Sequence, residues 1–367
     1  MGKFKKVFRA LRDPRAANAR HELLEVVFIA LAAVLCGAET ASDMARFGHA
    51  KKDVLGLFLQ LEHGIPSHDT FSRVFRLLDP AAFERAFRRF TVAFAKANRL
   101  DLTGVVAVDG KALRGAYARG RNATPLHLVN VFAVEARMAV AARQAPGRNE
   151  AAGALDVLAM LCLKRCIVTT DALHCSRAFA AAVLDREADY VLALKENQRK
   201  LFAAVARRFA RAGPRSTAQR LEPATHDRRE ARRATVIRDT TLAQTQAFPG
   251  IAALARITSR RRRQGNRADP PCVRYYLLSK YIPASKLLQI VRSHWSIENQ
   301  LHWMLDVVFQ EDANRARTDN APENFAILRR LALNLIRAHP APISMRQKIK
   351  SAAWDNSFLL ALLSHMQ

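Results

Sequence analysis

The sequence predicts a mixed α/β fold, in which a sheet flanked by helices follows an N-terminal segment made only of helices. Residues 1–100 have helical periodicity and almost no strand pattern, whereas strand-like runs begin at GVVAVDG. From there three strand-like runs follow one another, and strands then alternate with helices, which is typical of a mixed sheet with helices on its faces. We therefore expect a helical N-terminal domain over residues 1–100 and a second domain over residues 101–367.

The N-terminal segment contains three helical signals. HELLEVVFIALAAVLCGAET predicts a buried helix that ends near Gly37. A second apolar helix is broken at residues 64–66 (Gly-Ile-Pro), and Ser67 is placed to cap the next helix. A helix, a glycine-containing turn and a helix with Arg73 and Arg76 near its start outline a helix-turn-helix that could bind DNA ends. An ordinary helical hairpin remains an open alternative.

The second domain begins with three consecutive strand predictions, GVVAVDG, LHLVNVFAV and RMAVAARQ. A helix (NEAAGALDVLAMLCLK), the strand CIVTTD, the helix SRAFAAAVLDR and the strand DYVLALK follow. This succession matches the ribonuclease-H-like order, in which metal-binding acids lie on the first strand, the fourth strand and a late helix.

The regular alternation is lost between about residues 200 and 282, where short alternating runs predict an inserted β-rich element. Its tip carries four consecutive arginines that we expect in a basic loop, and these are Arg260, Arg261, Arg262 and Arg263. Contact with phosphates is favoured because the whole protein is basic, although a solvated charge run is the simpler alternative.

Charge indicates a polyanionic partner. The 367 residues include 59 Lys and Arg against 32 Asp and Glu, which gives a formal net charge of +27. Proteins that merely coat nucleic acid share this signature. A hydrophobic content of 50% excludes a disordered basic tail and indicates a real core.

The cysteines and the N-terminus favour a cytoplasmic protein with no membrane partner. Five cysteines are odd in number and lack paired zinc-ribbon spacing, which is typical of buried thiols in a reducing compartment. The apolar run VVFIALAAVLC follows a basic lead, but it is too short to span a bilayer and has no clean cleavage site.

Three acidic residues stand in settings that suit metal-dependent phosphoryl chemistry. Asp109 ends the apolar run GVVAVDG, Asp171 ends CIVTTD, and Glu298 lies in the amphipathic run SHWSIENQLHWMLDVVF. Converging carboxylates near buried strands repel each other unless a divalent metal neutralises them. An Asp before Gly is by itself ordinary turn chemistry. The combination and its order predict a metal-dependent enzyme that acts on DNA.

The run around Glu298 carries a polar stripe with a spacing of four residues, made of His294, Glu298, His302 and Asp306. These are zinc-ligand residue types, but the run lacks an HExxH arrangement, and four such residues on one helix cannot converge on one ion. For the two histidines we expect hydrogen bonds or phosphate contacts rather than metal ligation.

The motifs VDGKALRG, LHLVN, VTTDALH, DYVLALKENQ, RYYLLS, RSHWSIENQLHWMLDVVFQEDANRAR and NAPENFAILRRLALNL occur in that order. In this order they closely resemble the DDE transposases of bacterial insertion sequences, in the subgroup that includes the H-repeat-associated proteins. The N-terminal segment, with HELLEVVFIALAAVLCGAE and GIPSHDTFSRVFRLLDP, is similar to the helical domain that accompanies that catalytic domain. The resemblance runs from about Asp13 to His339.

The resemblance implies that Asp109, Asp171 and Glu298 are the catalytic acids. It also places Lys195, Asn197 and Gln198 in the family's Lys-x-Asn-Gln pattern, at the phosphates of DNA. Further phosphate contacts are expected from Lys111, Arg114 and His294. A related branch has Tyr, Arg and Lys around the glutamate, where this chain has Val291, His294 and Leu305. That departure removes support for a hairpin or base-capturing step taken from that branch.

The implied activity is endonuclease and strand-transfer chemistry on double-stranded DNA, at terminal inverted repeats and at target DNA. Two Mg²⁺ ions, or Mn²⁺ in their place, would activate water and stabilise the leaving 3′ oxygen. We further expect a homodimer in a synaptic complex and association with the nucleoid. Two alternatives stay open, a domesticated or inactive DNA-binding protein of the same fold and a stand-alone nuclease.

Overall fold

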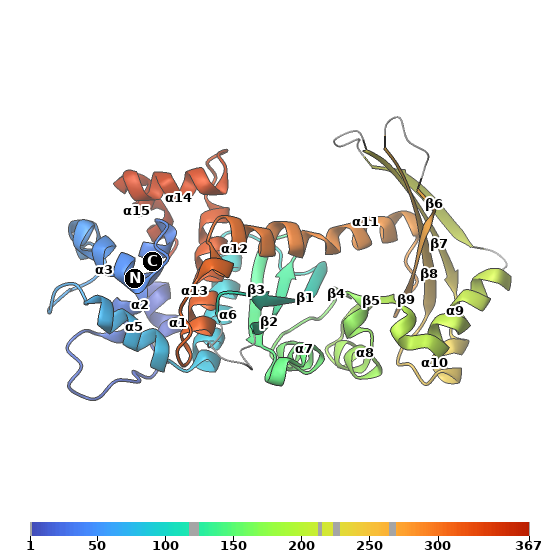
Figure 1. Ribbon diagram of the computed structural model, residues 1–367, viewed down its shortest axis with the longest axis horizontal. Coiled ribbons are helices and arrows are strands. Elements are labelled where there is room, and N and C mark those ends of the chain that lie inside the picture. Colours follow the sequence, from blue (N-terminus) through green and yellow to red (C-terminus); the bar gives the residue numbers. More distant parts are fainter. Residues whose placement is uncertain (1, 117–124, 212–214, 223–227, 264–268, 367) are drawn as a thin grey trace.

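A computed structural model describes residues 2–116, 125–211, 215–222, 228–263 and 269–366. The molecule is elongated (Figure 1), with helices from both ends of the chain at one end, the central sheet in the middle and the strands of the insertion at the other end. The N- and C-termini lie close together within the helical end. There the Phe4 N–H donates to the Met366 carbonyl oxygen at 3.1 Å.

One nine-stranded mixed sheet runs through the molecule in the order β3-β2-β1-β4-β5-β9-β8-β7-β6. β2 pairs antiparallel with β1 and β3, whereas β4 pairs parallel with β1 and with β5. The predicted mixed α/β class and the predicted order of elements are therefore confirmed. The bounds of these strands are β1 Val105–Leu113, β2 Leu126–Ala133, β3 Met138–Gln144, β4 Ile167–Thr170 and β5 Asp189–Leu194.

Two helices make the crossovers between the parallel strands, α7 (Glu150–Ala159) and α8 (Arg177–Leu184). Asn149 caps α7, and its side chain accepts a hydrogen bond from the Ala152 N–H at 3.1 Å. The apolar side chains of α7 and α8 join those of β1, β2 and β4 in one buried cluster on this face of the sheet. The cluster fixes the ends of β1 and β4 beside each other.

The insertion extends the central sheet instead of forming a separate one, because β9 pairs with β5. The predicted basic loop is wrong in its first part, since Arg260–Arg263 are the last residues of β8 and pair with β7. Residues 264–268, which would complete that loop, lie outside the described residues. The insertion consists of α9 Arg199–Arg211, β6 Ser216–Leu221, β7 Arg228–Arg238, α10 Thr241–Thr245, β8 Ala253–Arg263 and β9 Cys272–Leu278.

Within the described residues before β1, all regular structure is helical. Gly37 follows α2 with a φ of +93°, a backbone conformation that glycine tolerates at a helix end. Ser67 caps α5, where its Oγ accepts from the Thr70 N–H at 3.4 Å. No helix among the described residues is long and apolar enough to cross a membrane. The helices are α1 Gly2–Phe8, α2 Leu23–Leu35, α3 Ala41–Ala50, α4 Lys52–Gly56, α5 His68–Leu77 and α6 Pro80–Ala97.

These N-terminal helices share their hydrophobic core with the C-terminal helices α13 (Ala321–Ala338), α14 (Met345–Trp354) and α15 (Asn356–Ser364). Phe75 of α5 stacks on Phe325 of α13, with ring centroids 4.9 Å apart. The same buried cluster reaches Phe132 of β2 and so covers the face of the sheet opposite α7. The secondary structure therefore changes near residue 100, but the hydrophobic core includes residues from both sides of this predicted boundary.

The sequence suggested one regular helix around Glu298, but the structure divides this run into three elements. α11 (Ala284–His294) lies along the sheet and contacts β1, β4, β6 and β7. A π-helical turn (Ile297–His302) follows, and α12 (Trp303–Val307) completes the run. The widened turn places Glu298 beside β1, near Asp109, and near Asp171 at the end of β4.

The shared core predicts that the helical end and the sheet unfold together. Phe75→Ala should lower the free energy of unfolding by about 3–5 kcal/mol, because it removes a fully buried ring and leaves a cavity. All three tryptophans lie outside the N-terminal helices, so their fluorescence reports on the rest of the chain. Urea unfolding should give coincident transitions by fluorescence and by far-UV circular dichroism. Leu77→Ala, on an exposed position of the same helix, is the matched control. An earlier, separate loss of helical signal in Phe75→Ala would contradict a shared core.

Candidate active site

Asp109 and Asp171 lie side by side because β1 and β4 are parallel neighbours. Val108 is the partner of Thr170, so the two aspartates are the next residues along both strands. Asp171 directly follows β4, as predicted, and its Oδ1 atom accepts from the Leu173 N–H at 3.0 Å. Asp109 does not end its strand, because β1 continues past it while still paired with β2.

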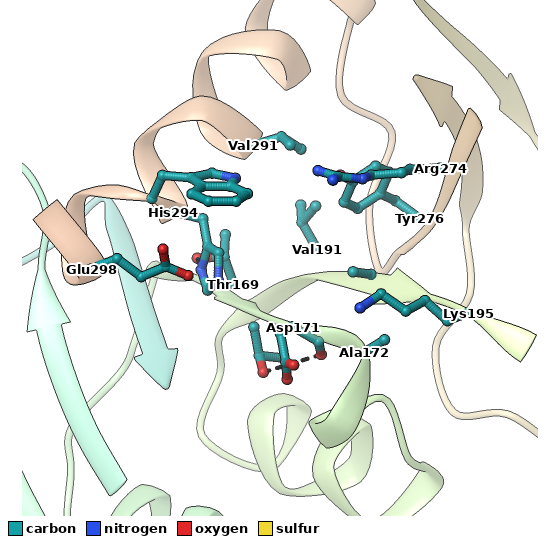
Figure 2. A pocket seen from close by; sticks show the side chains of 13 residues that line it. Thr169, Asp171, Ala172, Val191, Lys195, Arg274, Tyr276, Val291, His294 and Glu298 are labelled. Atoms are coloured by element: carbon teal, nitrogen blue, oxygen red, sulfur yellow. Dashed lines mark hydrogen bonds between the residues drawn. The ribbon is translucent and has the colours of Figure 1, made fainter. Parts of the chain in front are cut away.

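Glu298 approaches the two aspartates from the π-helical turn. In that turn the Trp303 N–H donates to the Glu298 carbonyl oxygen five residues back. The Glu298 side chain is exposed and, with Asp171, lines a cavity of about 230 Å³. Figure 2 shows Glu298 and Lys195 reaching toward this cavity from opposite sides. The walls between them include Tyr276 and Trp295.

The π-helical turn also explains how the polar stripe, whose residues are four positions apart, can face the sheet along its whole length. An α-helix has about 3.6 residues per turn, so positions four apart drift around it. A wider turn takes up the excess. As a result His294 contacts β4, His302 contacts β1 and β2, and Asp306 contacts β1. Glu298 lies between the two histidines in this stripe.

The negative charges of Asp171 and Glu298 act on Asp109. Burial, together with the negative charges of Asp171 and Glu298, raises the pKa of Asp109 to about 7. A hydrogen bond of 3.0 Å from the Gly110 N–H to the Asp109 carboxylate opposes this increase. The site therefore favours a proton or a metal cation among the acids.

Both histidines of the stripe are neutral at pH 7. Burial lowers the pKa of His294 to about 4 and that of His302 to about 3. The Nδ1 atom of His294 and the Oγ1 atom of Thr169 lie 3.0 Å apart. The Nδ1 atom of His302 lies 3.6 Å from Oδ2 of Asp109. His302 therefore stands as a neutral ring against Asp109 and His294 as a neutral ring against Thr169, and neither ring presents a positive charge to DNA phosphates.

Lys111 belongs to an ion-pair network behind the acids. Its ammonium group lies 2.7 Å from Asp306, 3.2 Å from Asp312 and 3.6 Å from Glu311, and the residue is buried. We predicted a phosphate contact for Lys111, but a buried ammonium with three carboxylate neighbours favours a structural role. It ties β1 to the segment that follows the π-helical turn.

Arg330 of α13 is the centre of the same network and is fully buried. It donates to Glu311 at 2.7 Å through Nη1 and to the Asn130 Oδ1 atom at 2.7 Å through Nε. The Asn130 amide nitrogen then faces Nε2 of His302 at 3.4 Å, which leaves the His302 proton on Nδ1, toward Asp109. Sequence reasoning did not single out Asn130 or Arg330. A polar residue inside an apolar strand and an arginine inside an apolar helix were the available signals.

The three residues of the Lys-x-Asn-Gln pattern have different surroundings in the structure. Lys195 is exposed and lines the cavity beside Asp171. The side chain of Asn197 instead donates to the Ala172 carbonyl oxygen at 2.9 Å, and that of Gln198 donates to the Cys175 carbonyl oxygen at 3.2 Å. These two side chains hold the short turn after Asp171, so in this structure they contact protein backbone.

The other predicted DNA contacts lie outside the cavity. Arg114 is 83% exposed and its Nε atom lies 3.7 Å from Asp312. Arg73 is exposed on α5, whereas Arg76 forms an ion pair with Asp319 at 2.8 Å. At the far end of the molecule, the end of β8 carries Arg260 and Arg262, both exposed, together with Arg261 and Arg263.

The donor set fits a hard divalent cation. Asp109, Asp171 and Glu298 supply only carboxylate oxygens, which suit Mg²⁺ or Mn²⁺ and not zinc. Burial and mutual repulsion raise the pKa of Asp109, and a cation among the acids relieves that repulsion. Across the described residues, no three His, Cys, Asp or Glu side chains stand close enough to hold one ion as they are. A bound ion would therefore draw the acids together.

Comparison with known proteins decides the family. The family model described as "Transposase DDE domain" matches residues 101–335, and the one described as "DDE_Tnp_1-associated" matches residues 5–91. The chain belongs to the DDE transposase family. It is a DDE-type transposase of the H-repeat subgroup, as its motifs indicated.

Two relatives of this transposase are from Escherichia coli (strain K12). "Putative protein YbfL" is 31% identical over 95% of this chain and 94% of its own length. "H repeat-associated putative transposase YhhI" is 30% identical over 95% of this chain and 93% of its own length. Among solved structures, the piggyBac transposase synaptic complex with hairpin DNA has a TM-score of 0.40 and 12% identity, over 98% of this chain and 77% of that chain. So distant a likeness carries nothing further about the site.

The raised pKa of Asp109 predicts that metal-free protein loses stability as pH rises. The folded protein keeps the Asp109 proton up to about pH 7, whereas the unfolded chain releases it near the ordinary value of 3.8. Folding then binds a proton between these values, so the free energy of unfolding falls as pH increases from about 4 to 7. Asp109→Asn should remove this loss and be more stable than the wild type at pH 8 by on the order of 2–4 kcal/mol. Urea unfolding in EDTA at several pH values measures the difference, and parallel curves for the two proteins would refute it.

Proposed function

We propose that this transposase hydrolyses phosphodiester bonds at the ends of its element and then transfers the freed 3′ hydroxyl group to target DNA. Its catalytic acids are Asp109, Asp171 and Glu298. The observation that carries this proposal is the pairing of β1 with β4, which brings the two aspartates together where the π-helical turn supplies Glu298. The order β3-β2-β1-β4-β5, with β4 and β5 parallel to β1, supports a ribonuclease-H-like arrangement.

The three acids would hold two Mg²⁺ ions, for which Mn²⁺ can substitute. When bound, these ions supply the positive charge that activates a water on one side of the phosphate and stabilises the leaving 3′ oxygen on the other. The protein itself supplies carboxylate donors fixed by strands, a neutral His302 beside Asp109 and a neutral His294 beside β4.

Lys195 is the residue placed to neutralise phosphate charge at the site, because its ammonium group lines the cavity beside Asp171. Arg274 lines the same cavity from β9. The chemistry needs no covalent protein intermediate, since the 3′ hydroxyl of the cut strand replaces water as the nucleophile in the second step. Charge neutralisation and positioning are therefore the main contributions of the side chains around the acids.

Glu298→Gln should abolish Mg²⁺-dependent cleavage of DNA while leaving DNA binding largely intact, because it removes one metal-binding charge and preserves size. Asp109→Ala and Asp171→Ala should behave alike. EDTA should block the wild-type reaction, and added Mn²⁺ should restore it. Glu196→Gln, an exposed acid next to Lys195, is the matched control and should cleave normally. Near-wild-type cleavage by Glu298→Gln, measured on a terminal-repeat duplex, would disprove the assignment of that residue.

Two separate surfaces are proposed to bind double-stranded DNA. The insertion carries exposed arginines on its antiparallel strands, Arg260 and Arg262 among them, and these suit contacts with phosphates of any sequence. Helix α5 carries Arg73 on an exposed face opposite its buried Val74 and Phe75, and this helix is proposed to enter a major groove of the element end.

A homodimer is the simplest assembly for this reaction. The two ends of an element are related by inversion, so a two-fold dimer can present one equivalent end-binding surface to each. Each protomer would then hold one end beside one set of acids.

The two surfaces should respond differently to substitution. Replacing Arg260 and Arg262 by Gln should weaken binding to all duplexes alike and reduce the slope of log affinity against log salt by about 0.9 for each lost phosphate contact. Arg73→Ala should lower the preference for the terminal repeat roughly tenfold or more and leave general affinity in place, since a base contact contributes about 1–3 kcal/mol. Competition binding with terminal-repeat and scrambled duplexes over a salt series measures both. A loss of discrimination in the insertion variant, with Arg73→Ala unchanged, would reverse the assignment.

A further inference from the structure

Glu150 lies against the backbone of β1 immediately beside Asp109. It occupies the first turn of α7, and its carboxylate rests on Gly110. A Cβ atom at position 110 would lie 2.3 Å from Oε2 of Glu150, so only glycine leaves room for this carboxylate. The close approach of an acid to the strand that carries Asp109 therefore requires glycine at position 110.

The carboxylate is also oriented from the neighbouring strand. His127 of β2 and Glu150 share a hydrogen bond of 2.8 Å between Nδ1 and Oε1. The second oxygen, Oε2, is the one that lies on Gly110. The Glu150 side chain is 20% exposed, so it remains reachable from solvent.

One edge of β1 is not covered by β4 at this point. The pairing of β1 with β4 stops at Val108, one residue before Asp109, whereas β1 itself continues. Successive side chains of a strand point to opposite faces, so Asp109 and the carboxylate on Gly110 stand on either side of β1. Groups from both faces can meet at the edge that β4 no longer covers.

A second observation places an unsatisfied polar group in the same neighbourhood. His174, in the turn after Asp171, is 1% exposed, and neither of its ring nitrogens has a hydrogen-bond partner among the described residues. Its charge environment includes Asp171 and Glu150, and Glu150 also acts on Asp109. A buried polar group without a partner indicates a missing ligand such as an ion with its water.

We propose that Glu150 is a fourth carboxylate of the metal site, reaching the cation from the α7 side of β1 with its orientation fixed by His127. The inference rests on the proposed function, because it adds a residue to the site formed by Asp109, Asp171 and Glu298. A purely structural Glu150 would serve only as the partner of His127. The two roles predict opposite effects of Glu150 on the stability of the metal-free protein. As a metal ligand it adds repulsion beside Asp109 and lowers stability, whereas as a structural partner of His127 it raises stability.

The test is Glu150→Gln in the full chain, which keeps an oxygen for His127 and removes the charge. The affinity for Mn²⁺, measured by calorimetry and by electron paramagnetic resonance without DNA, should fall about tenfold to a hundredfold. The rise in melting temperature caused by Mn²⁺ should shrink accordingly. The melting temperature in EDTA should stay equal or increase. Asp156→Asn removes one exposed charge from the same helix and should leave Mn²⁺ binding unchanged.

Wild-type affinity for Mn²⁺ in Glu150→Gln, with a lower melting temperature in EDTA, would overturn the proposal and leave a structural role. Gly110→Ala gives an independent reading, because its methyl group displaces the carboxylate, and it should also weaken Mn²⁺ binding. Asp109→Asn is measured in parallel to separate the two hypotheses. If Asp109→Asn loses Mn²⁺ affinity and Glu150→Gln does not, only the role of Glu150 fails. If Asp109→Asn binds Mn²⁺ as the wild type does, the proposed site itself is wrong.

Discussion

The parallel pairing of β1 with β4 is the constraint on which the rest of the site depends. Its register places Asp109 and Asp171 next to each other, and parallel strands require the crossover helix α7 between β3 and β4. The ends of adjacent parallel strands are a common place for functional groups, because the backbone there is held on both sides while the side chains face an open edge. The location of the acids follows from this pairing.

Burying a carboxylate and bringing like charges beside it both have an electrostatic cost, and both raise the pKa of Asp109. Lys195 lines the cavity together with Asp171 and Glu298, but it is exposed to solvent. Two buried cations, Lys111 and Arg330, are paired with Glu311 and neighbouring acids behind the site. They hold the π-helical turn on β1 and β2 and leave the carboxylates of the proposed catalytic acids available for metal. A buried pair of this kind fixes geometry more than it adds stability.

The long dimension of the molecule connects this site to two surfaces suited to DNA. Helix α11 contacts strands of the central sheet and of the insertion, and it leads directly into the π-helical turn that carries Glu298. The insertion is joined to the same sheet through β5 and β9. The acids, the arginines of β8 and the helical end therefore belong to one continuous framework (Figure 1). Both surfaces proposed to bind DNA thus have a fixed position relative to the three acids.

The sequence by itself determined the class of fold, the order of strands and helices, the family, the cap at Ser67 and the end of α2 at Gly37. Each of these depends on local signals: periodicity, capping residues and ordered motifs. The sequence also indicated Asp171 at a strand end correctly, because β4 stops where its apolar run stops.

Only the tertiary structure decided how the predicted residues are used. The sequence predicted a phosphate contact for Lys111, but the fold surrounds its ammonium group with carboxylates that are about two hundred residues away along the chain. Asn197 reads as a DNA contact, but it holds the turn after Asp171. The π-helical turn, the shared core of the two chain ends and the position of Glu150 on Gly110 likewise arise from packing between distant segments. Local sequence carries no signal for such contacts, because the free energy that fixes them comes from burial and pairing across the fold.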